Sequence, residues 1–374
     1  MVIRFDPAGS PENLHEMILS VSSLPGVSGL MILACDANGF TPPSIDPILS
    51  RAPIPVFGGV FPDIIHGRDM FEQGSLVIGL PKVLEIRCIP DLSNSAIDYE
   101  ALLDFRIPDD ESALTMMVFV DGFSRRISAF IESLFNNFGL QMNYIGGGAG
   151  SLSMAPKPCL FTNQGMVADG AVLALLGLAS GVGVAHGWTH LSGPYRVTSS
   201  DCNAILTLDW KPALDVYRKV VEAHSGMTFD TGNLSGSFKS YPFGISRLES
   251  EHIVRDPVRA GPDKSLICVG EVPQGAFVSI LNGDESSLIR AAGNALDLAL
   301  KAFPAQCEAG LNIFIDCISR VLFLGEGFTE ELKSVYRKNR PLVGACTIGE
   351  IANSGAEFLE FYNKTAVVAV LEAR

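Results

Sequence analysis

A thiol and a guanidinium stand close together near the C-terminal end of this 374-residue chain. Cys317 and Arg320 are separated by two residues, and a cation near a thiol lowers the thiol pKa and favours the thiolate. No histidine lies nearby in the sequence, so a hydrolase would need one from a distant part of the chain. The pair therefore indicates either a nucleophile or a group that binds a ligand.

A glycine turn further along the chain could complete a binding site. Arg320 can bind a carboxylate through two hydrogen bonds, while the turn at Gly349 and Glu350 supplies backbone donors and an acid for an amine. Such a site binds without catalysis. The structural alternative is that Arg320 pairs with Glu350 to hold the turn.

A second glycine-rich segment spans residues 146–150 and includes Gly147 and Gly148. It is followed by Ser-Leu-Ser-Met-Ala-Pro-Lys-Pro and not by a helix, so it lacks the context of a Rossmann or P-loop phosphate site. We therefore exclude nucleotide binding there and expect part of this loop to line a ligand pocket.

The elements that must position these residues form a pattern that occurs three times. Each copy has an apolar strand closed by Asp, a connecting helix, a Gly-containing strand and a further apolar strand. The Asp residues are Asp36, Asp121 and Asp316, and we expect them at equivalent strand ends. The copies cover residues 30–36, 55–59 and 75–80; 116–121, 143–147 and 171–176; and 312–316, 341–345 and 366–371.

Such units cannot bury their apolar faces alone, so the copies must pack together and leave a seam between them. Seams of this kind are common places for small-molecule pockets. We predict a pocket between the N-terminal and C-terminal halves, lined by the loop after Cys317, the turn at Gly349 and Glu350, and part of the 146–150 loop.

Composition limits the class of protein. Hydrophobic residues make up 47% and charged residues 18% of the chain, which is typical of a compact globular protein of two or three domains. A formal charge of −14 argues against nucleic acid or an anionic membrane as partner, because either requires a basic face.

Sequence signals for export and metal binding are missing. The N-terminus has no apolar segment behind a basic start, and the eight cysteines include no Cys-x-x-Cys pair. These features predict reduced thiols in the cytoplasm. The uncharged stretch after Gly170 predicts two buried strands and a turn rather than a membrane span.

Four helices are predicted from caps and from apolar residues at helical spacing: one opened by Ser10 and Pro11, one at 127–138 capped by Ser124, one from Pro212, and one at 284–303. The helix at Pro212 gives a domain boundary, with domains at 1–211 and 212–374. Residues 224–263 are predicted to be an irregular excursion or a mobile loop, and residues 265–270 and 276–281 to be paired strands.

Several motifs resemble those of the FIST family. Cys317-Ile-Ser-Arg320, Gly344-Ala-Cys-Thr-Ile-Gly349-Glu350-Ile and Asn363-Lys-Thr365 are similar to the FIST C signature. The 146–150 glycines, Phe161-Thr-Asn163 and Lys211-Pro-Ala-Leu-Asp-Val-Tyr217 are similar to the FIST N domain and its junction with the C domain. The resemblance covers almost the whole chain and implies a two-domain α/β fold with internally repeated units packed pseudo-symmetrically.

The resemblance also implies an intracellular small-ligand sensor that is not an enzyme. A chain of this length, with its Gly58-Gly-Val-Phe-Pro62 run, resembles the NosP group, which implies haem b, nitric oxide sensing and a histidine kinase partner in trans. His186 or His190 would be the axial ligand, with His66 a weaker candidate, although ordinary buried histidines are the alternative. A homodimer is also possible.

The sequence therefore predicts a cytoplasmic sensor whose ligand binds at the seam, without nucleic acid or membrane partners. Haem-dependent nitric oxide sensing ranks first, sensing of an amino-acid-like metabolite second, and an enzyme using Cys317 third. The expected ligand-binding residues are Cys317, Arg320, Gly349, Glu350, Gly147 and Gly148, and the expected metal ligands are His186 and His190.

Overall fold

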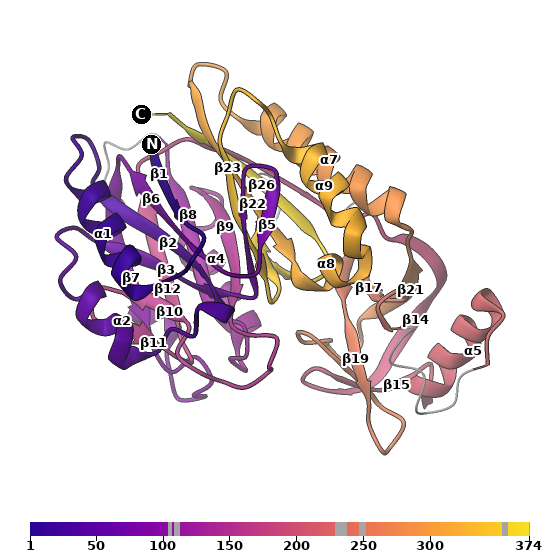
Figure 1. The fold of residues 1–374 in the computed structure, drawn as a ribbon. Helices are drawn as coiled ribbons and strands as arrows, with labels where there is room; N and C mark the ends of the chain where they lie inside the picture. The colour runs from indigo at the N-terminus through magenta and orange to yellow at the C-terminus, as the bar shows by residue number, and fades with distance from the viewer. Residues whose placement is uncertain (104–106, 108–112, 229–237, 247–251, 354–357, 374) are drawn as a thin grey trace.

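The computed structural model describes residues 1–103, 107, 113–228, 238–246, 252–353 and 358–373, which form a mixed α/β fold (Figure 1). The strands β1 to β26 of these residues belong to four sheets. Three sheets pack together, and the fourth extends away from the N-terminal strands with α5 at its side (Figure 1).

The strand bounds follow the order within each sheet. The first sheet holds β1 (Val2–Asp6), β6 (Ser75–Leu80), β2 (Gly29–Cys35), β3 (Val56–Phe61), β10 (Leu160–Thr162) and β11 (Gly165–Val167). The second holds β25 (Glu360–Tyr362), β24 (Glu350–Ala352), β9 (Asn143–Ala149), β8 (Thr115–Asp121), β12 (Ala171–Leu176) and β7 (Val83–Ile89). The third holds β13 (Ser180–Ala185), β26 (Ala366–Glu372), β22 (Ala309–Cys317), β23 (Leu342–Thr347), β4 (Asp63–His66) and β5 (Asp69–Phe71). The fourth holds β18 (Ile253–Arg255), β17 (Phe243–Ile245), β21 (Phe277–Asn282), β14 (Thr189–Asp201), β15 (Ala204–Leu208), β20 (Leu266–Cys268), β19 (Pro257–Ala260) and β16 (Lys211–Pro212).

The first three sheets share one pairing scheme. In each, a central strand (β2, β8 or β22) pairs parallel with a glycine-containing strand (β3, β9 or β23) and antiparallel with a closing strand (β6, β12 or β26). Gly58, Gly146 and Gly344 face Ile32, Val118 and Phe314 across the parallel pairs. A Cβ at these glycines would lie 1.9, 1.8 and 1.8 Å from the facing carbonyl oxygen, so only glycine allows this close pairing.

Each sheet also receives a hairpin from another unit. The β4–β5 hairpin extends the third sheet beside β23, β10–β11 extends the first beside β3, and β24–β25 extends the second beside β9. These exchanges bring segments far apart in the sequence to the edges of the sheets, including the segment that follows Gly349.

The three Asp residues do not lie at equivalent positions. Counted from the residue that faces the glycine, Asp36 is four residues along, Asp121 three and Asp316 two. Because side chains alternate along a strand, each step reverses the face. The position of Asp121 is taken by Cys35 in the first sheet and by Cys317 in the third, so the prediction of equivalent Asp residues is wrong.

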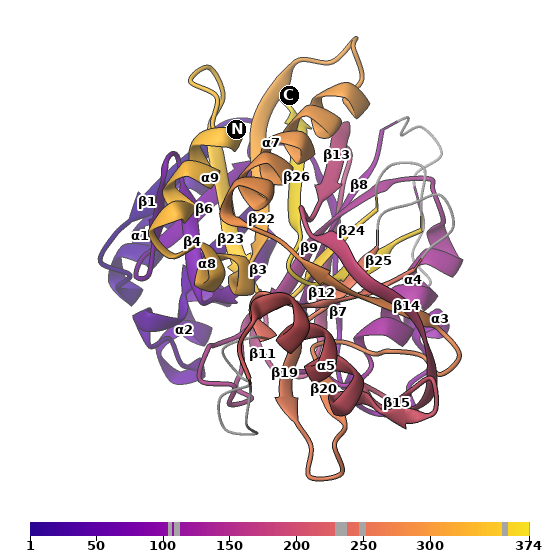
Figure 2. The same cartoon turned by 90° about the vertical axis from the view of Figure 1, so that its right-hand side faces the viewer.

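Helices connect and cover the strands. Their bounds are α1 (Pro11–Ser22), α2 (Pro42–Leu49), α3 (Tyr99–Leu102), α4 (Ile127–Phe138), α5 (Ala213–Ser225), α7 (Glu285–Ala302), α8 (Ile318–Leu324) and α9 (Phe328–Val335), with 3-10 turns η1 (Asp36–Asn38) and η2 (Gly325–Gly327). Figure 2 shows α7, α8 and α9 in front of β22, β23 and β26. The parallel pairs are joined through α2, through α4, and through α8 and α9 together, so the third connection has two helices where one was predicted.

Several helix signals are confirmed. The Ser10 side chain accepts a hydrogen bond from Asn13 N–H, and Asp284 accepts one from Ser287 N–H in a capping box. Ser124 instead donates to Asp169, and α4 begins after Arg126. The predicted apolar face of α4 is buried, with Phe130 and Leu134 in a cluster that contains Met116 and Val118.

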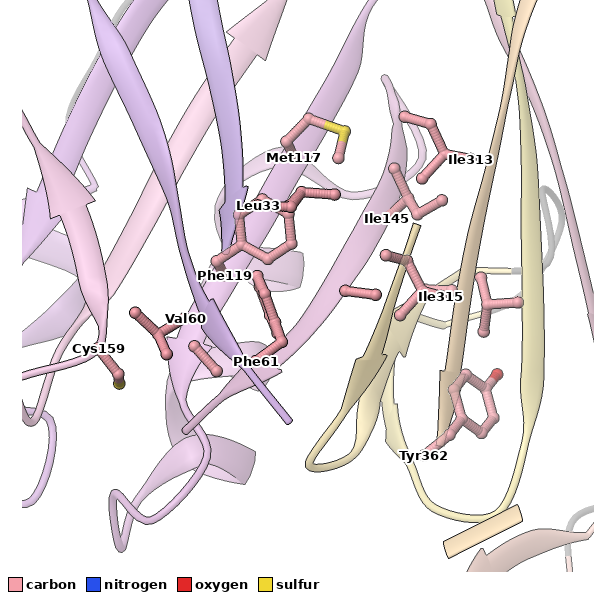
Figure 3. Packing of buried hydrophobic residues seen from close by; sticks show 14 of the residues in the cluster. Leu33, Val60, Phe61, Met117, Phe119, Ile145, Cys159, Ile313, Ile315 and Tyr362 are labelled. Carbon is pink, nitrogen blue, oxygen red and sulfur yellow. The ribbon is translucent and has the colours of Figure 1, made fainter. Parts of the chain in front are cut away.

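The inner faces of the three sheets share a core. Side chains from all three meet there, including Leu33, Val60, Met117, Phe119, Ile145, Ile313 and Ile315 (Figure 3). Phe314, between Ile313 and Ile315, and Val118, between Met117 and Phe119, point to the outer faces of their sheets, where helices cover them. This alternation explains why the strands read as continuous apolar runs.

Two predictions between residues 224 and 281 need correction. The described part of 224–263 contains β17, β18 and β19, with Phe243, Val254 and Ile245 buried; residues 229–237 and 247–251 lie outside the described part. β20 pairs with β15 and β19, whereas β21 pairs with β14 and β17, so these strands are not partners. The long strand β14 pairs with β21 on one side and with β15 on the other, so it separates β21 from β20.

The segment after Gly170 forms β12 and β13, as predicted. Across the described helices, none combines the length and apolarity that a membrane span requires.

Candidate functional site

A cavity of about 230 Å³ lies where β22 passes into α8. Its wall combines the turn before β24, the turn before β26, the link between β18 and β19, and the segment after β9. The lining residues are Leu152, Met154, Phe238, Lys239, Asp256, Pro257, Val258, Val269, Cys317, Ile318, Ser319, Leu322, Ile348, Gly349, Asn363 and Lys364. The cavity therefore lies between segments from both halves of the chain.

Backbone geometry fixes two of the turns. Gly349 has φ +84°, and a Cβ there would lie 2.3 Å from the Phe361 ring, so glycine is required. Lys364 also has a positive φ, of 50°, which is uncommon for a residue with a side chain. Cys317 ends β22 in an extended conformation and immediately precedes α8.

A buried ion pair forms part of the wall. The Lys364 ammonium is 3.3 Å from an Asp256 oxygen and donates to the Lys239 carbonyl at 3.1 Å. It also lies 5.3 Å from the centre of the Trp188 ring. Burial raises the pKa of Asp256, and the Lys364 charge opposes that rise.

Cys317 lines the cavity as a protonated thiol. Burial raises its pKa, and the nearby Glu350 carboxylate raises it further. This is the reverse of the lowering that a neighbouring Arg320 was expected to cause. A thiol in this environment is a poor nucleophile and acts as a weak hydrogen-bond donor.

Glu350 lies behind Cys317 and is not among the cavity-lining residues of the described chain. Its carboxylate accepts hydrogen bonds from Thr365 N–H at 3.1 Å and the Thr347 hydroxyl at 3.3 Å, and from the Cys317 thiol. Burial nevertheless raises the pKa of Glu350 to about 8. The group is therefore mainly protonated at neutral pH.

Arg320 points into a separate, fully buried cluster. Its Nε is 2.8 Å from Asp316 Oδ1, and its Nη2 contacts Glu331. Nη1 donates to the His186 carbonyl at 2.8 Å, and Nη2 also donates to the Leu288 carbonyl at 3.1 Å. These donors are directed to protein groups. Within the described residues, Arg320 forms no ion pair with Glu350 and does not line the cavity.

Two acids share the single Arg320 cation in this cluster. Burial acts to lower the pKa of Arg320, but Glu331 and Asp316 more than offset this and raise it. Burial and the adjacent Glu331 raise the pKa of Asp316 well above its ordinary range. Burial therefore opposes ionisation of both carboxyl groups, and the Arg320 charge favours it.

Gly147 and Gly148 lie in β9, beneath the same turn. Gly147 pairs with Glu350, and a Cβ on Gly148 would lie 2.1 Å from the Ile348 carbonyl oxygen. These glycines allow close backbone approach, and neither lines the cavity in the described chain. Leu152 and Met154, slightly further along, supply the wall instead.

The histidines named from the sequence lie elsewhere. His186 is 6% exposed, its Nδ1 accepts from Trp188 N–H at 2.9 Å, and burial lowers its pKa to about 3. His190 is exposed at the start of β14. His66 is half-buried, and its ring lies 5.0 Å from that of Phe5. None of the three lines the cavity beside Cys317.

A second hollow of about 680 Å³ runs along α5 and β14. It is lined by Leu191, Ser192, Tyr195, Asp209, Lys211, Asp215, Val216, Lys219, Val220, Ala223 and His224. His224 is thus a cavity-lining histidine that the sequence did not single out; its Nδ1 lies 3.0 Å from the Tyr241 hydroxyl. Among the described residues, no cluster of three or more His, Cys, Asp or Glu side chains is arranged to hold a metal ion.

Sequence reasoning missed the roles of Lys364 and Asp256 in the cavity wall. The Asn363-Lys-Thr365 motif could have indicated Lys364, whereas nothing in the pattern around Asp256 suggests a site. Asp256 reaches the cavity only because β18 and β19 join beside it.

Comparisons with known proteins give two family matches. Residues 29–211 match the model of the FIST N domain, and residues 213–353 match the model of the FIST C domain. A search of curated proteins finds no match. The cavity-lining residues Leu152 and Met154 fall in the first match, and Asp256, Cys317 and Gly349 in the second.

Proposed function

This chain is a FIST-domain protein, with a FIST N domain followed by a FIST C domain, and we propose that it is an intracellular small-ligand sensor acting on a separate signalling partner. One observation supports this most directly: the cavity beside Cys317 is lined from both domains. A ligand there contacts both at once, so its binding energy can depend on how the two are arranged.

The surroundings of α8 support a route for the signal. Ile318, Ser319 and Leu322 of α8 form cavity wall, while Arg320 of the same helix contacts Glu331 on α9 and the Leu288 carbonyl on α7. We propose that a ligand biases the position of α8 and that the α7–α9 layer presents this change to the partner. A ligand can act in this way only if it binds the two arrangements with different affinity.

Blocking the cavity tests the proposal. Leu322 and Leu298 are both 47% exposed and both lie on helices, but only Leu322 lines the cavity. Native mass spectrometry of the purified full chain should show a bound small molecule that Leu322→Trp removes and Leu298→Trp retains. Equal retention by both variants, or added ligands that bind both equally, would place the ligand site elsewhere.

Haem-dependent nitric oxide sensing upstream of a histidine kinase is the finer form of this proposal, carried by the family resemblance. The residues first named for it do not fit an axial role. The Nδ1 atom of His186 accepts a hydrogen bond from Trp188 N–H. His190 is exposed, and neither histidine lines either of the two cavities described above. Titration of the protein with haem should give a saturable Soret band if this form is correct, and His186→Ala/His190→Ala should leave it unchanged.

We propose a sensor without catalysis, because burial holds Cys317 as a thiol. Turnover of a thioester or amide that is lost in Cys317→Ser would overturn that choice. An amino-acid-like ligand remains the alternative to haem, and amino-acid titration of the wild-type chain distinguishes the two.

We also infer that the three strand units are pseudo-symmetric copies. Their shared pairings and the close approach of Gly58, Gly146 and Gly344 support this inference. Alanine at each glycine should then lower the free energy of unfolding by comparable amounts. A strongly unequal series would argue against equivalent positions.

A further inference from the structure

The mouth of the cavity beside Cys317 is apolar and exposed to solvent. Four of the largest exposed apolar side chains of the described chain line it: Leu152 (50% exposed), Met154 (60%), Val258 (43%) and Leu322 (47%). They come from three separate segments that converge only in the folded structure. Exposed apolar groups gathered in this way mark binding surfaces, since leaving them in water is unfavourable.

The charges of the cavity wall do not cancel. The charged lining residues are Lys239, Asp256 and Lys364, which makes two positive charges and one negative charge; Lys364 is fully buried, whereas Lys239 is exposed. Asp256 already pairs with Lys364 and also accepts a hydrogen bond from Ser319. Lys239 therefore leaves the described wall with an excess of one positive charge, in a chain whose formal charge is −14.

This arrangement discriminates between classes of ligand. A zwitterionic amino acid needs an anion for its ammonium, but Asp256 is committed to Lys364, and Glu350 lies behind Cys317. A cationic amphiphile would meet the excess positive charge. A neutral amphiphile would contact the apolar side chains at the mouth but form no ion pair with Lys239. An anion with an apolar body would make both interactions.

The volume sets the size. The cavity of about 230 Å³ lies below the roughly 300–1,000 Å³ that is typical of small-molecule sites, so it suits a small ligand. A carboxylate with a short hydrocarbon body is of this size.

We propose that the cavity binds a small amphiphilic monoanion, with its carboxylate beside the exposed Lys239 and its apolar body against Leu152, Met154, Val258 and Leu322. This inference rests on the proposed function in that it uses the same cavity. It adds the polarity of the ligand, which the family match does not specify.

Four compounds of matched size separate the classes: octanoate, 1-octanol, octylamine and leucine, each titrated into the full chain by calorimetry. Octanoate should bind with one site and about fivefold more tightly than 1-octanol, and octylamine and leucine should show no saturable heat. Affinity for octanoate should fall as salt rises, because the recognised charge is near the surface.

Two pairs of variants locate the interaction. Lys239→Gln should weaken octanoate binding about fivefold and leave 1-octanol binding unchanged, while Lys301→Gln, at an exposed lysine on α7, should change neither. Leu322→Asn should weaken both octanoate and 1-octanol, and Leu298→Asn should weaken neither.

The outcomes distinguish this inference from the proposed function. Equal binding of 1-octanol and octanoate, or octanoate binding unaffected by Lys239→Gln, would overturn the anionic class while leaving a ligand sensor. Leucine binding that Leu322→Trp abolishes would replace the class with an amino acid. If no compound binds and the native mass spectra show no Leu322-dependent ligand, the cavity is not a small-molecule site and both proposals fail.

Discussion

The two sides of α8 use charge in opposite ways. On one side, the Arg320 guanidinium is fully buried and is held by Asp316, Glu331 and two backbone carbonyls. On the other, Lys239 and the apolar mouth face a cavity that is open to solvent. Groups paired with protein partners stabilise the fold, while groups that face a cavity can recognise a ligand. Cys317 and Arg320 are only three positions apart in the sequence, yet Cys317 lines the cavity and Arg320 lies in the buried cluster.

The largest expected effect is on the buried side. Arg320→Leu should lower the free energy of unfolding by about 3–5 kcal/mol, because it leaves Asp316 and Glu331 buried without their cation. Urea denaturation at neutral pH measures this change. The triple variant Arg320→Leu/Asp316→Asn/Glu331→Gln should recover part of the loss, and a single variant as stable as wild type would contradict a structural role for Arg320.

Glu350, which lies behind Cys317, should make the free energy of unfolding depend on pH. Its folded pKa is raised to about 8 from the ordinary 4.5, so the folded state binds a proton that the unfolded state releases. This contribution is fully present below pH 4.5 and is lost as pH rises through about 8, by up to about 1.4 kcal/mol per pH unit. Denaturation from pH 5 to 8 should therefore show a shallower fall for Glu350→Gln, and parallel curves would contradict the raised pKa.

Thiol reactivity should separate the cavity wall from the free surface. Cys202 is exposed and Cys317 is buried, and burial raises the pKa of Cys317. With iodoacetamide under native conditions, peptide mass spectrometry should find Cys202 alkylated about 100-fold faster than Cys317. Comparable rates would mean that Cys317 is accessible as thiolate, which would revive the catalytic alternative.

The smallest expected effect on stability is at the cavity mouth. Leu322→Asn should change the free energy of unfolding by no more than about 0.5 kcal/mol, as should its exposed control Leu298→Asn. Urea denaturation of both variants checks this. A much larger loss for Leu322→Asn would show that the mouth is structural and would weaken the contrast between the two sides of α8.

Local signals in the sequence were sufficient for much of the secondary structure. Ser10, Asp284 and the apolar face of α4 act over a few residues, so caps and helical spacing reveal them without knowledge of the fold. The repeated strands were likewise visible, since Gly58, Gly146 and Gly344 recur within similar apolar runs. The one-residue shifts among Asp36, Asp121 and Asp316 were not visible, because strand register is set by pairing with another segment.

The sequence by itself determined the α/β class and located the three sets of repeated strand segments, and it predicted a pocket near Cys317 and Gly349. Only the tertiary structure decided which charges meet. Arg320 binds Glu331 and the distant His186 carbonyl, and Asp256 meets Lys364 across more than a hundred residues of chain. Spacing along a chain fixes only the neighbours within an element, whereas partners across elements depend on how strands exchange and helices pack.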